Sequence, residues 1–252
     1  MLSKSKIKLI TSLAQKKYRD EYGLFIAEST KLVLDLLPLL DCDLLVATPE
    51  WLLKNSATKA QETIEVTENE LRKISSQKTP QGVLAVFRKP VYTYDINATG
   101  RELSLALDDV QDPGNLGTII RIADWFGIEN VFCSLHTADV FGTKAIQATM
   151  GALARVKVHY VDLPAFLQKC ADKTAIYGTF MNGGSIYNEQ ELSPNGIIVM
   201  GNEGNGISKE VEKHVSKRLL IPNFPEGKAT SESLNVGIAT ALVCAEFRRR
   251  MI

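Results

Sequence analysis

The sequence predicts an α/β protein built on a parallel sheet, with a smaller α/β domain ahead of it. From residue 103 onward, strand-like and helix-like segments alternate, which is typical of a parallel sheet with helices on both faces. The composition, 45% hydrophobic and 23% charged, resembles that of an average globular protein and supplies enough apolar residues for a packed core. We place the small domain at 1–90, a linker at 91–101 and the larger domain at 102–252.

The small domain is predicted from short segments of both kinds. A lysine-rich opening helix ends near Tyr22–Gly23, and a strand follows over 24–27. Ser29 or Thr30 would cap a helix that runs through Leu40. The remaining elements are a strand over 44–48, a short helix over 50–55, a strand over 62–67, a helix over 68–75 and a strand over 82–87.

The turn-rich stretch 88–100 lacks helical periodicity and predicts the linker. The elements expected beyond it are longer. They are strands over 103–110, 130–134, 156–161, 175–180, 196–201 and 218–221, with helices over 116–126 and 143–151 and a final helix over 234–250.

Overall charge predicts nothing about partners, because Lys+Arg and Asp+Glu are both 29. The first twenty residues nevertheless carry six basic residues against one acidic residue, and Arg248–Arg250 closes the chain. A basic face for nucleic acid can be hidden in a neutral total. Solvated helix ends explain the same charges, so both interpretations stay open.

The cysteines and the apolar segments predict a soluble cytoplasmic protein. Four scattered cysteines form no CxxC pair and are predicted to be buried thiols in a reducing compartment. The best apolar run, 32–40, is far shorter than the roughly 20 residues that span a bilayer. Lysines in the opening helix interrupt any signal-peptide core.

Three loops at strand ends are rich in polar residues and glycine, and ligands of parallel sheets bind at such ends. The first loop, 108–121, contains a Pro113–Gly114 turn. Asn115 fits a helix N-cap, with a catalytic role as the alternative. Arg121 lies among apolar helix residues, where an arginine needs a partner.

The second loop, 201–206, follows an apolar strand and has three glycines that allow close backbone approach to a ligand. Its GxxGxG order is not the dinucleotide fingerprint, and the chain contains no phosphate-binding GxxxxGK[ST] loop. Glu203 inside the loop favours a functional role over a ligand-free turn.

The third loop lies between Ile221 and the last helix. Ser233 is a good N-cap and Asn235 a tolerable first-turn residue. Residue chemistry alone does not decide between these structural roles and a catalytic one.

Together the three loops resemble the signature motifs of the SpoU (TrmH-type) RNA ribose 2′-O-methyltransferases, in the SPOUT superfamily. The segments are DPGNLGTIIRIADWFG, IIVMGNEGNGIS, and LLIPN followed by SESLNVGIATALVCAE, in the family's order, within 105–250. The first ninety residues are similar to the family's substrate-binding domain, notably Arg19, GLFIAE at 23–28 and QGVLAV at 81–86.

The resemblance implies a catalytic domain whose C-terminal segment threads a deep trefoil knot, and which works as a homodimer. It also implies that the knotted loops bind S-adenosylmethionine. By motif, the cofactor-binding residues are Gly201, Ile221 and Leu234. No metal is implied, because the sulfonium methyl group is already activated.

By the same match, the catalytic residues are Asn115, Arg121, Glu203, Ser233 and Asn235. The family arginine is implicated in activating the ribose 2′-hydroxyl, yet arginine is a poor general base because its pKa exceeds about 12. We therefore expect Arg121 to bind the adjacent phosphate and to stabilise developing oxyanion charge. Glu203 and Asn115 would orient Arg121, while Ser233 and Asn235 would organise the loop at the methyl donor.

Two departures from the family pattern concern the RNA. The loop 222–232 is longer than in compact relatives and includes Glu226 and Glu232, which would disfavour RNA entry. Gln147 stands where many relatives have a basic residue, which removes one phosphate contact.

The family resemblance favours ribosomal RNA as substrate over transfer RNA, because a folded domain precedes the catalytic one. A tRNA 2′-O-methyltransferase is the alternative. A non-catalytic RNA-binding or ribosome-assembly protein is disfavoured because Arg121, Glu203 and Asn235 are all present. An S-adenosylmethionine enzyme acting on something other than RNA is disfavoured by the basic opening helix.

Overall fold

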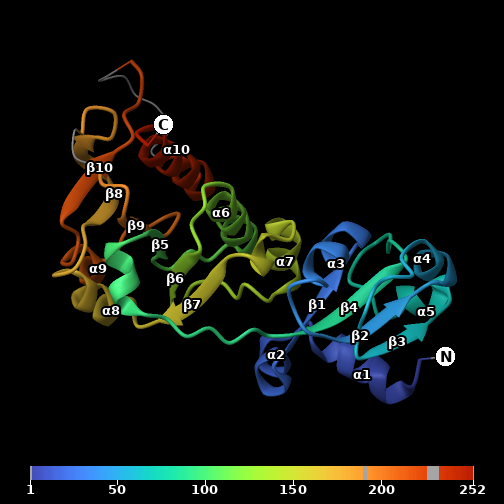
Figure 1. Ribbon diagram of the computed structural model, residues 1–252. Helices are drawn as coiled ribbons and strands as arrows, with labels where there is room; N and C mark the ends of the chain where they lie inside the picture. The colour runs from blue at the N-terminus through green and yellow to red at the C-terminus, as the bar shows by residue number, and fades with distance from the viewer. Residues whose placement is uncertain (1, 190–191, 226–232, 252) are drawn as a thin grey trace. The chain divides into compact units, whose positions relative to one another are not determined.

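The computed structural model describes residues 2–189, 192–225 and 233–251, which divide into two compact units (Figure 1). The first unit combines 1–91 with 139–155, and the second combines 92–138 with 156–252. The segment 139–155, which the sequence analysis assigned to the larger domain, therefore packs with the N-terminal unit.

A four-stranded mixed sheet forms the centre of the first unit, in the order β1-β4-β2-β3. The central strand β4 is antiparallel to both neighbours, and β2 is parallel to β3. The strands are β1 (Leu24–Glu28), β2 (Cys42–Ala47), β3 (Glu62–Glu65) and β4 (Val83–Arg88). The helices are α1 (Lys4–Ser12), α2 (Lys16–Tyr22), α3 (Thr30–Leu36), α4 (Pro49–Lys54), α5 (Glu68–Arg72) and α7 (Thr143–Thr149), with a 3-10 turn at Ala152–Ala154.

The predicted strands of this unit are confirmed, whereas several helices differ from the prediction, among them the helix predicted over 68–75, which ends at Arg72. The single opening helix is divided into α1 and α2, and Gly23, with a φ of 64°, ends α2 in the left-handed conformation that glycine adopts easily. The next helix ends at Leu36 rather than Leu40. Ser29 is its N-cap residue, but its side chain makes no capping bond.

The segment 139–155 is attached to the first unit by an ion pair and by aromatic packing. The buried guanidinium of Arg19 donates to Asp139 Oδ2 at 2.7 Å and to the carbonyl oxygens of Leu13 and Ala14. Phe141 packs on Phe25 with ring centroids 5.1 Å apart. These contacts give a physical reason for the segment's placement, which sequence periodicity does not encode.

The second unit contains the predicted parallel sheet, with six strands in the order β10-β8-β9-β5-β6-β7, all parallel. They are β5 (Leu103–Leu107), β6 (Asn130–Ser134), β7 (Lys157–Val161), β8 (Ile176–Ser185), β9 (Gly196–Met200) and β10 (Lys217–Leu220). The helices are α6 (Pro113–Trp125), α8 (Leu163–Cys170), α9 (Lys209–Glu212) and α10 (Val236–Arg249), with a 3-10 turn at Ile96–Gly100.

Helices cover both faces of this sheet, as predicted (Figure 1). Ala106, Phe132 and Val199 share a buried cluster with α8 and α9. Because alternate strand residues point to opposite faces, Tyr177 points to the other face, where its ring meets Phe247 of α10 at 4.9 Å. There α10 packs along α6.

Two of the three closing arginines bind backbone carbonyls within the second unit, whereas Arg249 pairs with Glu246 and its side chain stays 68% exposed at the helix end. Arg248 donates to the carbonyl oxygens of Phe126 and Gly127, at the end of α6. Arg250 donates to the carbonyl oxygens of Ile186 and Glu189, in the β8–β9 connection. The positive charge of Arg248 and Arg250 is therefore used to fasten α10 rather than to form a free basic face.

All four cysteines are free and buried, as predicted. Burial raises the pKa of the Cys42 and Cys244 thiols to about 12, which makes both unreactive near neutrality. No helix in the described part of the chain is long and apolar enough to cross a membrane.

Candidate active site

The loop after β5 is fixed by hydrogen bonds from two other loops. The buried Asp108 carboxylate accepts the backbone N–H of Ser208 at 2.7 Å, and the Asp109 N–H donates to Ser134 Oγ at 2.9 Å. Asp109 has a φ of 59°, an unusual conformation for a residue other than glycine. Such strain persists only where the surroundings impose it, and it is common at functional sites.

The N-cap of α6 is Asp112, not Asn115 as the sequence favoured. The Asp112 side chain accepts the Asn115 N–H at 2.9 Å, and Pro113 occupies the first helical position. The Asn115 side chain is therefore free for its alternative role.

The loop after β9 turns so tightly that Gly201 has no room for a side chain. A Cβ at Gly201 would lie 2.2 Å from the Gly206 carbonyl carbon. Asn202 holds the turn, since its Oδ1 accepts the N–H groups of Gly204 and Asn205, and its Nδ2 donates to the Asp109 carbonyl oxygen at 2.7 Å. The turn leaves Glu203 exposed at its tip.

Three of the predicted site residues form one chain of hydrogen bonds from three separate elements. Glu203 Oε1 accepts Asn115 Nδ2 at 2.9 Å, and Asn115 Oδ1 accepts Asn235 Nδ2 at 3.0 Å. Longer contacts of 3.4 and 3.5 Å bring the backbone N–H groups of Gln111 and Asp112 to the same carboxylate. The arrangement fixes the amide of Asn115 and brings a carboxylate beside the start of α6.

Asn235 also begins α10, and this corrects the N-cap prediction for the third loop. Its Oδ1 accepts the N–H groups of Gly237 and Ile238 at 3.0 and 3.3 Å. Asn235 is therefore the N-cap, whereas Ser233 is exposed ahead of the helix.

Arg121 does not join this chain of hydrogen bonds. It lies on the exposed side of α6, and the described residues offer it neither a hydrogen bond nor an ion pair. Six residues on an α-helix correspond to about 9 Å of rise and a change of face, which separates Arg121 from Asn115. Within the described residues Arg121 therefore has no partner, and the expected orientation of Arg121 by Glu203 and Asn115 is not made there.

Two of the three predicted cofactor residues directly follow strands of the same sheet, and the third precedes α10. Gly201 is buried directly after β9, and Ile221 is half-buried directly after β10. Leu234 is 48% exposed just before α10. Within the described part of the chain, the backbone groups of Ile221 and Leu234 make no hydrogen bond. Unpaired backbone donors and acceptors beside apolar side chains suit the polar edge and flat faces of an adenine.

The acidic part of the third loop, with Glu226 and Glu232, lies outside the described residues. Among those described, no group of three or more His, Cys, Asp or Glu side chains is placed to hold a metal ion.

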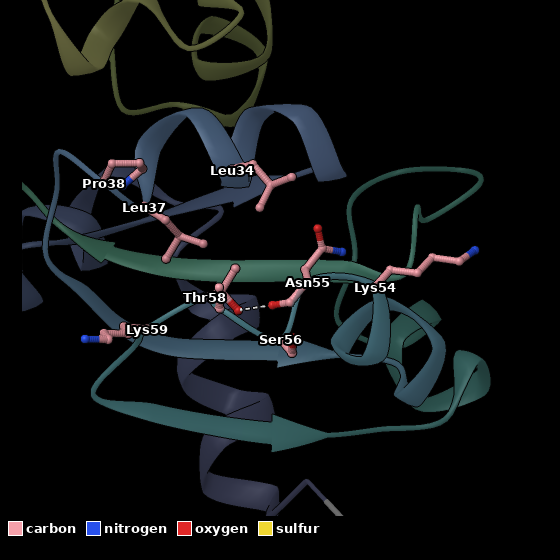
Figure 2. A pocket seen from close by; sticks show the side chains of 9 residues that line it. Leu34, Leu37, Pro38, Lys54, Asn55, Ser56, Thr58 and Lys59 are labelled. Carbon is pink, nitrogen blue, oxygen red and sulfur yellow. Dashed lines mark hydrogen bonds between the residues drawn. The ribbon is translucent and has the colours of Figure 1, made fainter.

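A groove of about 560 Å³ lies elsewhere, in the first unit, between α3 and the segment 54–59 (Figure 2). Leu34, Leu37 and Pro38 give it an apolar side, with Lys54 and Lys59 on the other. All eight predicted site residues belong to the second unit, whereas the residues that line this groove belong to the first.

Sequence reasoning missed the residues that shape the site without facing a ligand. Asp108 belongs to the first loop and Asn202 to the second, yet neither was given a role. The available signal was an asparagine at the start of a glycine-rich turn, because asparagine side chains readily bond to nearby backbone N–H groups. The contact from Asp108 to Ser208 spans 100 residues and has no local signature.

Comparison with known proteins gives a consistent result. Residues 102–245 match the model of the SpoU rRNA Methylase family, and residues 4–85 match an MRM3-like substrate binding domain. A curated relative, the 23S rRNA (guanosine(2553)-2'-O)-methyltransferase RlmP of Bacillus subtilis, is 30% identical over 96% of both chains.

Solved structures agree over the whole length. A putative RNA methyltransferase of the TrmH family from Porphyromonas gingivalis is 41% identical, with a TM-score of 0.90 and 99% of each chain covered. An AdoMet-bound rRNA methyltransferase from Sinorhizobium meliloti is 30% identical, with a TM-score of 0.84, covering 100% of this chain and 97% of the other.

Proposed function

The chain belongs to the SpoU rRNA methylase family, and on that premise we propose that it methylates a ribose 2′-hydroxyl of ribosomal RNA with S-adenosylmethionine as methyl donor. The observation that carries the proposal is the bonded series Glu203–Asn115–Asn235, which joins all three signature motifs at one edge of the sheet. Ribosomal RNA is favoured over transfer RNA by the RlmP relative, which matches over nearly its full length.

S-adenosylmethionine, when bound, supplies an electrophilic methyl group. The residues proposed to hold it are Gly201, Ile221 and Leu234. The unpaired backbone groups of Ile221 and Leu234 support this role. The absence of a side chain at Gly201 keeps the loop backbone close to the strand end.

With a methyl donor held there, the ribose 2′-oxygen would be the nucleophile, and its negative charge and its proton would need groups that accept them. We assign Arg121 to the phosphate beside the target ribose and to the negative charge that develops on the 2′-oxygen. The phosphate is a candidate acceptor for the proton. The hydrogen bond between Glu203 and Asn115 would hold the loop after β9 against the start of α6 at the reaction site. Asn235 with Ser233 would hold the third loop at the methyl donor.

A homodimer is proposed because two packed helices expose large apolar side chains. On α10, Ile238 is 57% and Leu242 38% exposed, one helical turn apart. On α6, Trp125 is 86% exposed, one turn after Arg121. Burial of Trp125 against a second copy would bring Arg121 into the interface and give it partners that the described part of one chain does not offer.

A C-terminal trefoil knot is the remaining part of the proposal. Arg250 donates to carbonyl oxygens of the β8–β9 connection. The helix α10 follows the edge strand β10 but packs on α6, which follows the inner strand β5. These contacts support a C-terminal segment that passes through that connection. A crystallographic trace of 186–252 tests it, and an unthreaded trace would contradict it.

The activity is tested with labelled S-adenosylmethionine and total RNA from a strain lacking the gene. Label at one ribose 2′-position of ribosomal RNA is expected, and Arg121→Ala should abolish it while cofactor binding is retained. Label in transfer RNA alone would overturn the substrate assignment. Unchanged turnover by Arg121→Ala would overturn the role of Arg121.

A further inference from the structure

Three chain segments of the first unit meet at one end of its sheet. Thr30 Oγ1 donates to the Gln81 carbonyl oxygen at 3.3 Å and accepts from Trp51 Nε1 at 2.9 Å. The Thr48 N–H donates to the Gly82 carbonyl oxygen at 2.9 Å. We call this surface the three-segment end, formed by residues 28–31, 48–51 and 73–82.

A buried carboxylate fixes the longest of these segments. Glu28 is only 3% exposed, and its carboxylate accepts the Ser76 N–H at 3.0 Å, Ser76 Oγ at 2.6 Å, and the Ser75 hydroxyl. A buried carboxylate is tolerated only when hydrogen bonds replace its water. The bonds therefore hold the backbone around Ser75 and Ser76 to the end of β1.

The three-segment end collects lysines whose ammonium groups have no partner among the described residues. In the first unit, six exposed lysines have a side chain that makes no hydrogen bond, ion pair or ring contact within that part of the chain. Three of them, Lys31, Lys73 and Lys78, belong to this end. The other three are Lys4, Lys8 and Lys59. Residues 73–82 include no acidic residue.

Two neutral side chains at this end have donors of the kind that bind a nucleic acid backbone. Thr79 carries a hydroxyl and Gln81 an amide, and both residues are exposed. The aromatic Trp51 is only 5% exposed, so it presents no ring on which a base could stack. Single-stranded bases are usually held by stacking, whereas folded RNA is held through phosphates and 2′-hydroxyls.

We propose that the three-segment end binds the sugar–phosphate backbone of a folded region of the RNA substrate, with Lys31, Lys73 and Lys78 on its phosphates. The inference rests on the proposed function, because it takes ribosomal RNA as the ligand. One face of the first unit then captures the RNA, and this face recognises the shape of the RNA rather than its base sequence.

The test compares two triple variants that remove the same charge from the same unit. One is Lys31→Ala/Lys73→Ala/Lys78→Ala, and the control is Lys4→Ala/Lys8→Ala/Lys59→Ala, in full-length protein. The readouts are the Kd for folded ribosomal RNA, the salt dependence of that Kd, methyl transfer to the same RNA, the Kd for S-adenosylmethionine and the Tm.

We expect the first triple to weaken RNA binding about tenfold or more and to lower the salt slope by about 2–3, since each lysine–phosphate contact contributes about 0.7–0.9. Cofactor affinity and Tm should stay at the wild-type value. The control triple should bind RNA as wild type does. Equal losses in both triples, or an unaffected first triple, would overturn the proposal.

A second variant tests the fixed shape of the segment around Ser75 and Ser76 apart from the charge of the three lysines. Ser75→Ala/Ser76→Ala keeps the three lysines but removes two hydroxyl donors to Glu28. RNA binding should weaken while the salt slope stays unchanged. If wild type binds the RNA but methylates none, the proposed function fails while the inference stands. RNA binding insensitive to every one of these changes overturns the inference alone.

Discussion

Gly201 shows how one missing side chain shapes the candidate cofactor loop. Gly201→Ala would force a Cβ against the Gly206 backbone, where there is no flexible side chain to move away. We expect a loss of about 1–3 kcal/mol in stability and a large loss of S-adenosylmethionine affinity. Thermal unfolding and cofactor titration measure both effects.

Gly204→Ala is the matched control in the same loop. The nearest atom to a Cβ there is Asn202 Oδ1 at 3.6 Å, an ordinary contact. Its stability and cofactor affinity should stay close to wild type. If Gly201→Ala behaved like Gly204→Ala, the tight turn would have no part in cofactor binding.

The asparagines mark the limit of prediction at the scale of residues. Sequence chemistry favoured Asn115 as a cap and left Asn235 as a first-turn residue, whereas Asp112 and Asn235 are the caps. Several neighbouring residue types can cap a helix, and sequence does not say which backbone bends there. The bond between Asn115 and Asn235 spans 120 residues and depends on the packing of α6 on α10.

At the scale of elements, the last turn of α10 depends on one buried carboxylate. Glu246 is 5% exposed and accepts hydrogen bonds from Arg249 at 2.8 Å and Arg250 at 2.9 Å. The bond from Arg249 is the main cause that lowers the pKa of Glu246 to about 2. Because the folded pKa lies below the unfolded one, Glu246 stabilises the fold above about pH 4.5, and that contribution is lost as pH falls through about 2.

Glu246→Gln tests this contribution. At neutral pH the variant should be less stable than wild type by up to about 3 kcal/mol, since each pKa unit corresponds to about 1.4 kcal/mol. The difference should shrink between pH 4.5 and 2 as wild type becomes protonated. Denaturant unfolding across this range measures it, and a difference independent of pH would contradict the assignment.

Most strands of both sheets were predictable, because buried strands are short apolar runs bounded by turn residues. The ends of the helices were less predictable from the sequence. Residues 37–40 continue the apolar pattern of α3 yet lie beyond its end, since apolar periodicity does not mark where hydrogen bonding stops. The attachment of 139–155 to the first unit depends on Arg19 and Asp139, which are 120 residues apart. No pattern within either segment encodes that pairing.

For the whole molecule, we expect residues 1–91 alone to lack a fixed tertiary structure. In the intact first unit, Phe25 is fully buried and packs on Phe141, and Arg19 is paired with Asp139. Without 139–155, an apolar face and a buried guanidinium lose their partners. Near-ultraviolet circular dichroism should show weak tertiary signal, which a synthetic peptide of residues 139–155 restores. Cooperative unfolding of the fragment without peptide would refute the expectation.

The proposed dimer makes a separate prediction about where Arg121 acts. Arg121 is exposed beside Trp125 and bonds to nothing within the described chain. If it completes the site of a second copy, inactive Arg121→Ala and inactive Glu203→Ala proteins should recover activity when mixed and allowed to exchange. Random pairing gives one intact site in half of the dimers, so about a quarter of the wild-type rate is expected.

Recovery should require exchange of subunits, so a mixture combined immediately before the assay is the control. No recovery after complete exchange would place Arg121 in its own chain's site.

The first unit is built from two separate segments of the chain, and this has a consequence during synthesis. The ribosome delivers residues 1–91 early, but the segment that covers Phe25 is finished only at residue 155. At about 5–20 residues per second, the intervening stretch takes about 3–13 s to translate. During that interval the nascent N-terminal unit exposes an apolar face. Chaperones at the exit of the ribosomal tunnel would bind such a face.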